Sequence, residues 1–123
     1  METTQILLLV LVSLILFFRI KKYFLRRSLK NYTNVEVKQL LKSNSNIVLL
    51  DVRTDGERRS GAIKQSIHIP LHEISFKTDV LKKYANREII CYCQTGSRSV
   101  SAASKLKKLG FNSANLLGGF IRW

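Results

Sequence analysis

The chain has 123 residues, which is enough for one small domain and little besides. Its formal net charge is +13, from 21 Lys and Arg against 8 Asp and Glu, so anionic partners are favoured: lipid headgroups, nucleic acid or small anions. The sequence contains no aromatic-basic stacking platform and no nucleic-acid-binding motif, so we expect no nucleic-acid partner.

An apolar run opens the chain. Residues Ile6–Phe18 read ILLLVLVSLILFF, and Ser13 is the one interruption. A helix rises by ~1.5 Å per residue, so residues 3–20 would cover roughly 27 Å, just short of a hydrocarbon core of ~30 Å. Flanking cations can snorkel to close that gap, and Tyr23 and Phe24 would lie at the interface. The run therefore predicts one N-terminal transmembrane helix.

Two other interpretations of this run are weaker. A cleaved signal peptide needs cations before the apolar stretch and small residues after it, whereas here Glu2 precedes the run and cations follow it. A buried core helix is disfavoured because the run is apolar all round and lies outside the pattern of strands and helices that follows. We therefore expect residues 1–30 to be a membrane anchor with a basic juxtamembrane segment, and residues 31–123 to be one domain.

The cations after the run predict its orientation. There are six of them: Arg19, Lys21, Lys22, Arg26, Arg27 and Lys30. Cytoplasmic flanks of membrane spans carry an excess of Lys and Arg. We therefore expect a single-pass protein of the cell membrane whose domain faces the cytoplasm. The same cations would contact anionic lipid.

Helices and strands alternate through the rest of the chain. Thr33–Glu36 has the form of a capping box, and it predicts a helix over residues 34–43. Further helical segments are expected at residues 55–60, 72–84 and 97–109. Short apolar runs predict four strands, at residues 47–52, 66–70, 88–93 and 114–117. This alternation is typical of an α/β domain with a parallel sheet, which binds ligands beyond the carboxyl ends of its strands.

The two cysteines, Cys91 and Cys93, close the third predicted strand. They are too few for a disulfide framework, and a ring between residues so close would be strained. Neither His68 nor His72 stands at zinc-finger spacing from them, so we expect no metal site. This cysteine usage suits a reducing compartment and a reactive thiol.

Cys93 begins a loop between a predicted strand and a predicted helix. The loop reads Cys93-Gln94-Thr95-Gly96-Ser97-Arg98-Ser99. A thiol beside a helix N-terminus meets unpaired N–H groups and the positive end of the helix dipole, and both lower its pKa. Gly96 lets the chain curl with positive φ, so that N–H groups point inward as an anion nest, and Arg98 adds a permanent cation. The pattern predicts a cradle for an anionic sulfur or oxyanion with Cys93 as its nucleophile. A buried structural cysteine is the alternative.

Three stretches resemble rhodanese homology domains. IICYCQTGSRSVSAASKLKKLGF resembles the active-site strand, loop and helix of that family, LLDVRTDGE at Leu49–Glu57 resembles its Asp-x-Arg segment, and LLGGFIRW at Leu116–Trp123 resembles its closing Gly-Gly and Trp. The match covers about 80 residues in the family's order. The anchor is similar to that of bacterial membrane-tethered single-domain members. The chain departs from the family's Gly-His-Ile-Pro-Gly-Ala segment at residues 61–66, which read GAIKQS.

The resemblance implies a rhodanese-like parallel five-stranded sheet with helices on both faces, and sulfurtransferase activity. Cys93 would take a sulfane sulfur from a small anionic donor such as thiosulfate, hold it as a persulfide and pass it to a thiol acceptor, with a protein thiol as one option. The substrate would be bound by the rest of the loop: Gln94, Thr95, Gly96, Ser97, Arg98 and Ser99. Arg98 and Ser99 would also fix the loop. The transfer needs neither a metal nor an organic cofactor.

Two other functions fit parts of the pattern. A cysteine-based phosphatase or arsenate reductase uses a similar loop, but protein phosphatases of that kind place five residues between Cys and Arg, whereas four stand between Cys93 and Arg98. A non-catalytic membrane-tethered docking module is the other candidate, although such modules usually lack the cysteine. Sulfur release from thiosulfate and phosphate release from an ester would separate these functions.

Five further residues have mainly structural interpretations. We expect Asp51 to satisfy backbone donors near the site and Arg53 to pair with Glu57. Cys91 is most simply a buried strand residue, with resolution of a persulfide as the alternative. Between the two histidines, His68 is expected in the core and His72 near a pocket rim.

Overall fold

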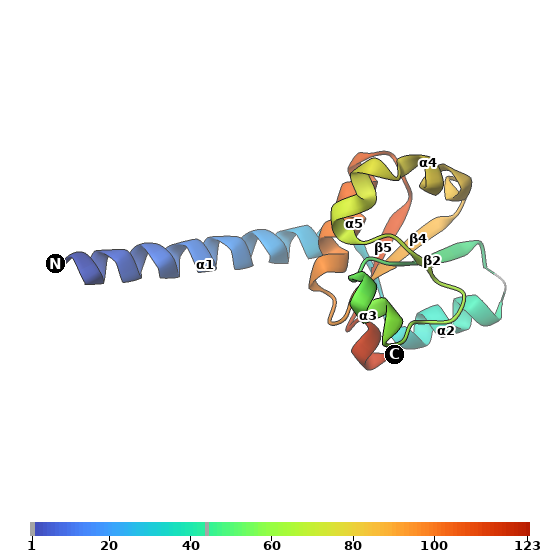
Figure 1. The fold of residues 1–123 in the computed structure, drawn as a ribbon, viewed down its shortest axis with the longest axis horizontal. Coiled ribbons are helices and arrows are strands. Elements are labelled where there is room, and N and C mark those ends of the chain that lie inside the picture. The colour runs from blue at the N-terminus through green and yellow to red at the C-terminus, as the bar shows by residue number, and fades with distance from the viewer. Residues whose placement is uncertain (1, 44) are drawn as a thin grey trace.

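One parallel sheet organises the domain. The computed structural model describes residues 2–43 and 45–123. The sheet contains five strands: β1 (Lys30–Tyr32), β2 (Ile47–Asp51), β3 (Ile67–His68), β4 (Glu88–Tyr92) and β5 (Ser113–Leu116). Their order is β1-β5-β4-β2-β3, and each pairing between neighbours is parallel. Figure 1 shows the three central strands β5, β4 and β2 side by side. The rhodanese-like five-stranded α/β architecture implied by the sequence is confirmed.

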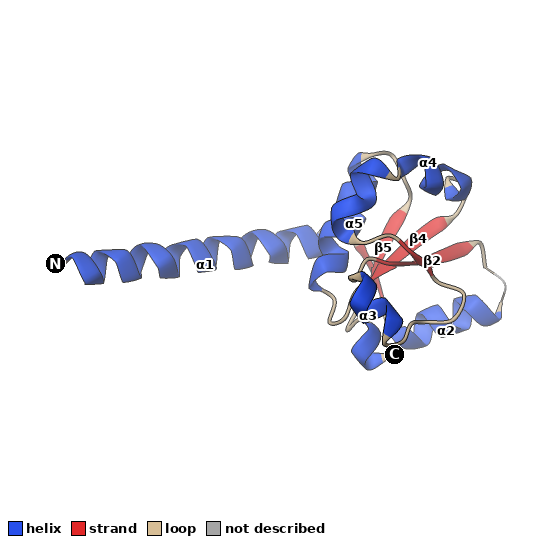
Figure 2. Ribbon diagram, viewed as in Figure 1, coloured by secondary structure: helices blue, strands red, loops and turns tan. Residues whose placement is uncertain are grey.

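Helices cover both faces of this sheet. The α-helices of the domain are α2 (Asn34–Lys42), α3 (Asp55–Arg59), α4 (Thr78–Leu81) and α5 (Ser97–Lys108). Figure 2 shows α4 and α5 on one side of the sheet and α2 on the other. Two hydrophobic clusters follow this division: Val100 and Leu106 of α5 belong to one, and Val37 of α2 belongs to the other. Both faces of β4 are therefore buried, as its nearly continuous apolar sequence predicts.

The apolar pattern missed one strand. β1 reads KNY and pairs with β5, with Lys30 opposite Ala114. It is short, lies at the edge of the sheet and has Tyr32 as its one buried residue. A polar edge strand of this kind leaves no run of apolar residues in the sequence. Contact with β5 places it in the sheet.

The helix predicted over residues 72–84 is wrong. The segment forms a 3₁₀ turn (Leu71–Phe76), the short helix α4, and a second 3₁₀ turn (Lys82–Tyr84). Lys77 interrupts it with φ −116° and ψ 26°, outside helical geometry. The interruption lets the two pieces bury Ile74 and Leu81 separately. The strand predicted over residues 66–70 is also shorter in the structure, where β3 spans Ile67–His68.

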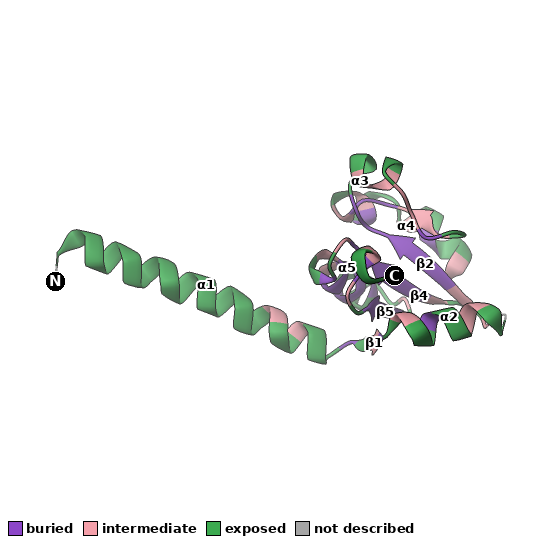
Figure 3. Cartoon of the chain, turned by 90° about the horizontal axis from the view of Figure 1, so that it is seen from below, coloured by how far each residue is buried: buried purple, intermediate pink, exposed green. Residues whose placement is uncertain are grey.

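The first helix, α1 (Thr3–Arg27), projects from the domain (Figures 1 and 3). It is long and apolar enough to cross a membrane, and none of its apolar window is buried in the protein. Its last turns contact the domain. Lys22 donates a hydrogen bond to Ser101 of α5, Leu25 packs against the hydrophobic core, and Lys107 Nζ donates to the Ser28 carbonyl at 3.0 Å. The end of α1 is thus fastened along α5.

Candidate active site

Cys93 lies at the carboxyl end of β4, which runs between β5 and β2 in the sheet. The chain then turns through Gly96, whose φ of 108° is left-handed, and enters α5 at Ser97. Glycine adopts this conformation without the steric cost that a Cβ brings. The Cys93 side chain is buried, with 1% of the residue exposed. The sequence therefore placed this residue correctly, between a buried strand and a helix N-terminus.

The loop of residues 93–99, which we call the Cys93 loop, directs hydrogen bonds at the sulfur. The Gly96 N–H donates to Cys93 Sγ at 3.0 Å. The Cys93 thiol donates to Ser99 Oγ at 3.4 Å, and the Ser99 hydroxyl donates to Asn115 Oδ1 at 2.6 Å. When the thiol ionises, rotation of the Ser99 hydroxyl lets it donate to the sulfur instead. The surroundings of Cys93 can therefore satisfy an anionic sulfur.

These contacts change the acidity of Cys93. Burial raises the pKa of the thiol, because it disfavours the charged form. Hydrogen bonds from the Ser99 hydroxyl and N–H lower the pKa, and the N–H groups of Gly96 and Thr95 lower it further. The net result is a pKa below the ordinary value of a thiol. The expected activation of Cys93 thus arises mainly from hydrogen bonds within the loop.

Arg98 is paired instead of pointing freely into the loop. Its Nη1 and Nη2 atoms donate to Glu57 Oε1 and Oε2 at 2.6 and 2.8 Å. This bidentate pair lies in partly exposed surroundings and holds the pKa of Glu57 at about 2. Glu57 also caps α3, because Thr54 donates its N–H to Oε1 at 3.1 Å. The permanent cation expected at the cradle is therefore neutralised, and Arg98 connects the Cys93 loop to α3.

Arg53 does not pair with Glu57, so that prediction is wrong. It pairs with Asp51, with Nη2 2.9 Å from Oδ2, and both residues are almost fully buried. Arg53 lies two residues after Asp51, the last residue of β2, and its guanidinium carbon lies 4.3 Å from the Phe120 ring centroid. Asp51 does accept a backbone N–H, that of Arg53 at 2.9 Å, as expected. This buried pair also contacts the loop that follows Cys93, because Arg53 Nη1 donates to Gln94 Oε1 at 3.1 Å.

The C-terminal turn fixes the backbone of the same loop. The Phe120 N–H donates to the Cys93 carbonyl at 2.8 Å, and the Ile121 N–H donates to the Gln94 carbonyl at 3.1 Å. Gly119 permits this approach: a Cβ there would lie 2.5 Å from Cys93 O, and its φ is 64°. The Gly-Gly turn before Trp123 therefore acts as a backbone clamp on the Cys93 loop.

Comparison with known proteins agrees with this geometry. A family model described as "Rhodanese-like domain" matches residues 33–123. The chain belongs to the rhodanese-like family. YtwF of Bacillus subtilis, which is named provisionally as a sulfurtransferase, is 30% identical to this chain over 95 residues, covering 77% of this chain and 90% of its own length. A sulfurtransferase of Allochromatium vinosum is 33% identical over 86 residues, covering 69% of this chain and 78% of its own length.

A solved structure has the same fold. The crystal structure of a rhodanese-related protein from Thermoplasma volcanium superposes with a TM-score of 0.69 at 29% identity, covering 76% of this chain and 89% of that chain. Family membership and the names of the relatives support sulfurtransferase activity in general for this rhodanese-like domain.

The remaining loop residues of the rhodanese-like domain have different positions. Thr95 and Ser97 are exposed, whereas Gly96 and Ser99 are buried. The Gln94 side chain turns towards Arg53. The loop therefore presents its N–H groups, not its polar side chains, to the sulfur, with Ser99 as the exception.

Two residues around the rhodanese-like site were not predicted to contribute. Asn115 is buried in β5 and joins Ser99 to Asn31, to whose Oδ1 its Nδ2 donates at 3.0 Å. A polar residue inside the apolar run Ala114-Asn115-Leu116 was the available signal. Lys22 of α1 is the second, because its hydrogen bond to Ser101 places its ammonium group on α5, the helix that follows the Cys93 loop. No short-range pattern connects it with the loop.

Cys91 agrees with its structural interpretation, because it is fully buried, and burial raises the pKa of its thiol. His68 was expected in the core, but it is only half-buried in the edge strand β3, where its Nε2 lies 2.7 Å from the Arg53 carbonyl. His72 lines an open depression of about 310 Å³ beside Arg98. In the part of the chain that the structure describes, no three side chains cluster as metal ligands.

Proposed function

We propose that this protein transfers a sulfane sulfur through a persulfide on Cys93. The observation that carries the proposal is the buried Cys93 sulfur, which lies 3.0 Å from the Gly96 N–H at the N-terminus of α5. A lowered thiol pKa supplies the nucleophile. Inward N–H groups supply the positive field that a terminal persulfide sulfur needs.

Each half of the reaction exchanges one S–S bond for another. In the first half, the Cys93 thiolate attacks the outer sulfur of a donor such as thiosulfate. A bond forms between Sγ and that sulfur, the sulfur–sulfur bond of the donor breaks, and sulfite leaves with the electron pair. Cys93 then carries a persulfide anion. In the second half, an acceptor thiolate attacks the outer sulfur of the persulfide. A bond forms between the acceptor sulfur and that outer sulfur, the bond to Cys93 Sγ breaks, and the Cys93 thiolate leaves with the electron pair, so the acceptor carries the persulfide. No external oxidant or reductant is required.

The Cys93 loop would stabilise both the Cys93 thiolate and the persulfide anion. N–H groups from Gln94 to Ser99 would hold the terminal sulfur of the persulfide, and the depression beside Arg98 would admit the donor. Lys105 also lines that depression, and its positive charge favours an anionic donor. Because Arg98 is neutralised by Glu57, its contribution is to hold the loop in place.

We also propose that residues 1–30 anchor residues 31–123 to the cytoplasmic face of the cell membrane. The support is an apolar run followed by six cations, in a helix that has no buried residue. A membrane anchor accounts for this exposed apolar surface, which a water-soluble helix would not tolerate.

The test of sulfur transfer is release of sulfite from thiosulfate with a thiol acceptor, measured beside release of phosphate from a chromogenic ester. Sulfite release that requires Cys93 supports the proposal. Phosphate release without sulfite release would identify a phosphatase, and neither release, with a folded domain, would identify a docking module.

A further inference from the structure

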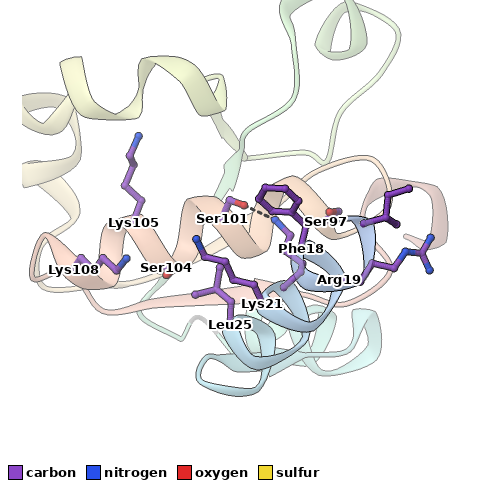
Figure 4. Close-up of a pocket in the computed structure, with 11 residues that line it drawn as sticks. Phe18, Arg19, Lys21, Leu25, Ser97, Ser101, Ser104, Lys105 and Lys108 are labelled. Carbon is purple, nitrogen blue, oxygen red and sulfur yellow. Dashed lines mark hydrogen bonds between the residues drawn. The ribbon is translucent and has the colours of Figure 1, made fainter. Parts of the chain in front are cut away.

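A groove runs between the anchor helix and the helix that follows the Cys93 loop. It has a volume of about 770 Å³, within the range of roughly 300–1,000 Å³ typical of small-molecule sites. α1 forms one wall and α5 forms the other (Figure 4). We call it the anchor groove. Of its lining residues, only Lys105 also lines the depression beside Arg98.

The anchor groove is cationic. Five of the described residues that line it are basic and none is acidic: Arg19, Lys21, Lys22, Lys105 and Lys108. None of these cations lies within ion-pair distance of a carboxylate in residues 2–43 and 45–123. Positive charges gathered along one groove repel each other, and an anion bound among them offsets that repulsion. Charge complementarity therefore indicates an anionic occupant.

One end of the same groove is apolar. Ile15 and Phe18 of α1 line it at the side nearer the chain start, and the cations begin at Arg19. Lys22 lies only about 3 Å beyond Ile20 along the axis, at ~1.5 Å per residue. With residues 3–20 in hydrocarbon, the apolar end lies among acyl chains and the basic end lies at the level of the phosphates. An occupant with an apolar chain and an anionic head matches both ends.

Hydroxyl groups complete the basic end. Ser101 and Ser104 of α5 line the groove, and Figure 4 shows Lys21 and Leu25 of α1 beside them. Lys22 already donates to Ser101. Ammonium and hydroxyl donors together are the groups that bind phosphate oxygens. Ser97, the first residue of α5 and a member of the Cys93 loop, lines the groove as well.

We propose that the anchor groove binds one anionic phospholipid, with its phosphate among Lys21, Lys22 and Lys108 and an acyl chain along Ile15 and Phe18. A lipid in this position fixes α5 against the membrane surface. It therefore holds the Cys93 loop at the level of the headgroups. The inference rests on the proposed membrane anchoring of α1 and is independent of the sulfur transfer.

The test uses the full chain in neutral detergent, with native mass spectrometry as the readout for bound lipid. The probes are phosphatidylglycerol, phosphatidylcholine with the same acyl chains, and inorganic phosphate. The wild type should retain one phosphatidylglycerol at least tenfold more tightly than phosphatidylcholine. Inorganic phosphate alone should bind far more weakly, because it lacks the chain.

A matched pair of variants locates the site. Lys21→Ala/Lys108→Ala removes one cation from each wall, and both side chains are exposed, so folding is retained. Arg26→Ala/Lys83→Ala removes the same number of charges from α1 and the domain, outside the groove. The first variant should lose phosphatidylglycerol affinity by roughly tenfold to thirtyfold. The second should retain it.

Each remaining outcome overturns the inference. Equal retention of the two lipids would mean a non-selective apolar surface. Equal losses in the two variants would mean diffuse attraction to charge, and phosphate binding as tight as lipid binding would mean a free-anion site. Flotation with vesicles of phosphatidylcholine alone tests the anchor separately. A chain that fails to float refutes the anchor. A chain that floats, but shows no preference for phosphatidylglycerol in the mass spectrometry, refutes lipid binding in the anchor groove alone.

Discussion

Arg98 and Glu57, 41 residues apart in the chain, form a bidentate pair with N–O distances of 2.6 and 2.8 Å. The pair joins the loop that surrounds the Cys93 sulfur to the N-terminal cap of α3. Sulfur transfer at Cys93 would therefore depend on the position of α3, although the hydrogen bonds to the sulfur in the described structure come from Gly96 and Ser99. This relationship has a measurable pH signature.

Glu57→Gln should destabilise the protein at neutral pH. The folded-state pKa of Glu57 is lowered from 4.5 to about 2, so its stabilisation is fully present above pH 4.5 and is lost as the pH falls towards 2. Because the pair is partly exposed, we expect a loss of about 0.5–1 kcal/mol at pH 7. Thermal unfolding of the full chain in detergent, followed by circular dichroism, measures this. The difference from wild type should shrink through that acid window, and a difference independent of pH would contradict the role of the ion pair.

Ser99→Ala should raise the pKa of Cys93. The Ser99 hydroxyl is one of the groups that lower this pKa. Without it, fewer hydrogen bonds offset the rise in pKa that burial causes. A hydrogen bond to a charged group contributes about 1.5–3 kcal/mol, so a rise of roughly one to two pKa units is expected. The rate of iodoacetamide alkylation against pH, in a Cys91→Ser background, reports the thiolate.

Ser97→Ala is the control for that experiment. Ser97 lies in the same loop but is exposed and makes no hydrogen bond with the sulfur in the described structure. Its alkylation profile should overlay that of the parent. A shift of equal size in both variants would mean that the loop as a whole, and not the Ser99 hydroxyl, sets the acidity.

Gly119→Ala should loosen the backbone clamp on the Cys93 loop. The new Cβ would lie 2.5 Å from the Cys93 carbonyl oxygen, whereas a Cβ at Gly110 would meet nothing within 4 Å. Both glycines have positive φ, and the Gly119 combination of φ 64° and ψ −161° is essentially restricted to glycine, so backbone strain of about 1–3 kcal/mol is expected there as well. Overpacking should add about 1–3 kcal/mol at Gly119 alone. Denaturant unfolding should rank Gly119→Ala below Gly110→Ala, and equal stability of the two would contradict the clamp.

The membrane orientation has a direct cellular test. Protease added to intact cells should leave residues 31–123 whole, and it should digest them after the membrane is permeabilised. The chain should stay in the membrane fraction. Digestion in intact cells would reverse the orientation. Recovery of the full-length chain in the soluble fraction would contradict the anchor, and recovery of a shortened chain would indicate a cleaved signal sequence.

The parts of the site that the sequence predicted are local ones. Cys93, Gly96 and Ser99 lie within seven residues, where a buried strand meets a helix, and their geometry follows from backbone rules that a single loop obeys. The parts it missed are the choices of side-chain partner. Arg53 pairs with Asp51, two residues before it, and Glu57 pairs with Arg98. No spacing in the sequence distinguishes these partners.

The fold shows the same division. A buried strand such as β4 can be recognised in the sequence as an apolar run. β1 is polar, and it forms a strand because it pairs with β5. Of the apolar positions that predicted a helix over residues 72–84, Ile74 and Leu81 are buried, whereas Val80 is exposed and Tyr84 is half-buried. The apolar spacing could not show that the chain breaks at Lys77, because docking of each piece on the sheet decides that break.

The most direct test of the account is the intact mass of the full chain after incubation with thiosulfate. Wild type and Cys91→Ser should each gain the mass of one sulfur atom, and a thiol acceptor should remove it. Cys93→Ser should gain nothing while remaining folded. A sulfur adduct on Cys93→Ser, or wild type that releases sulfite from thiosulfate without ever carrying sulfur, would contradict a persulfide on Cys93.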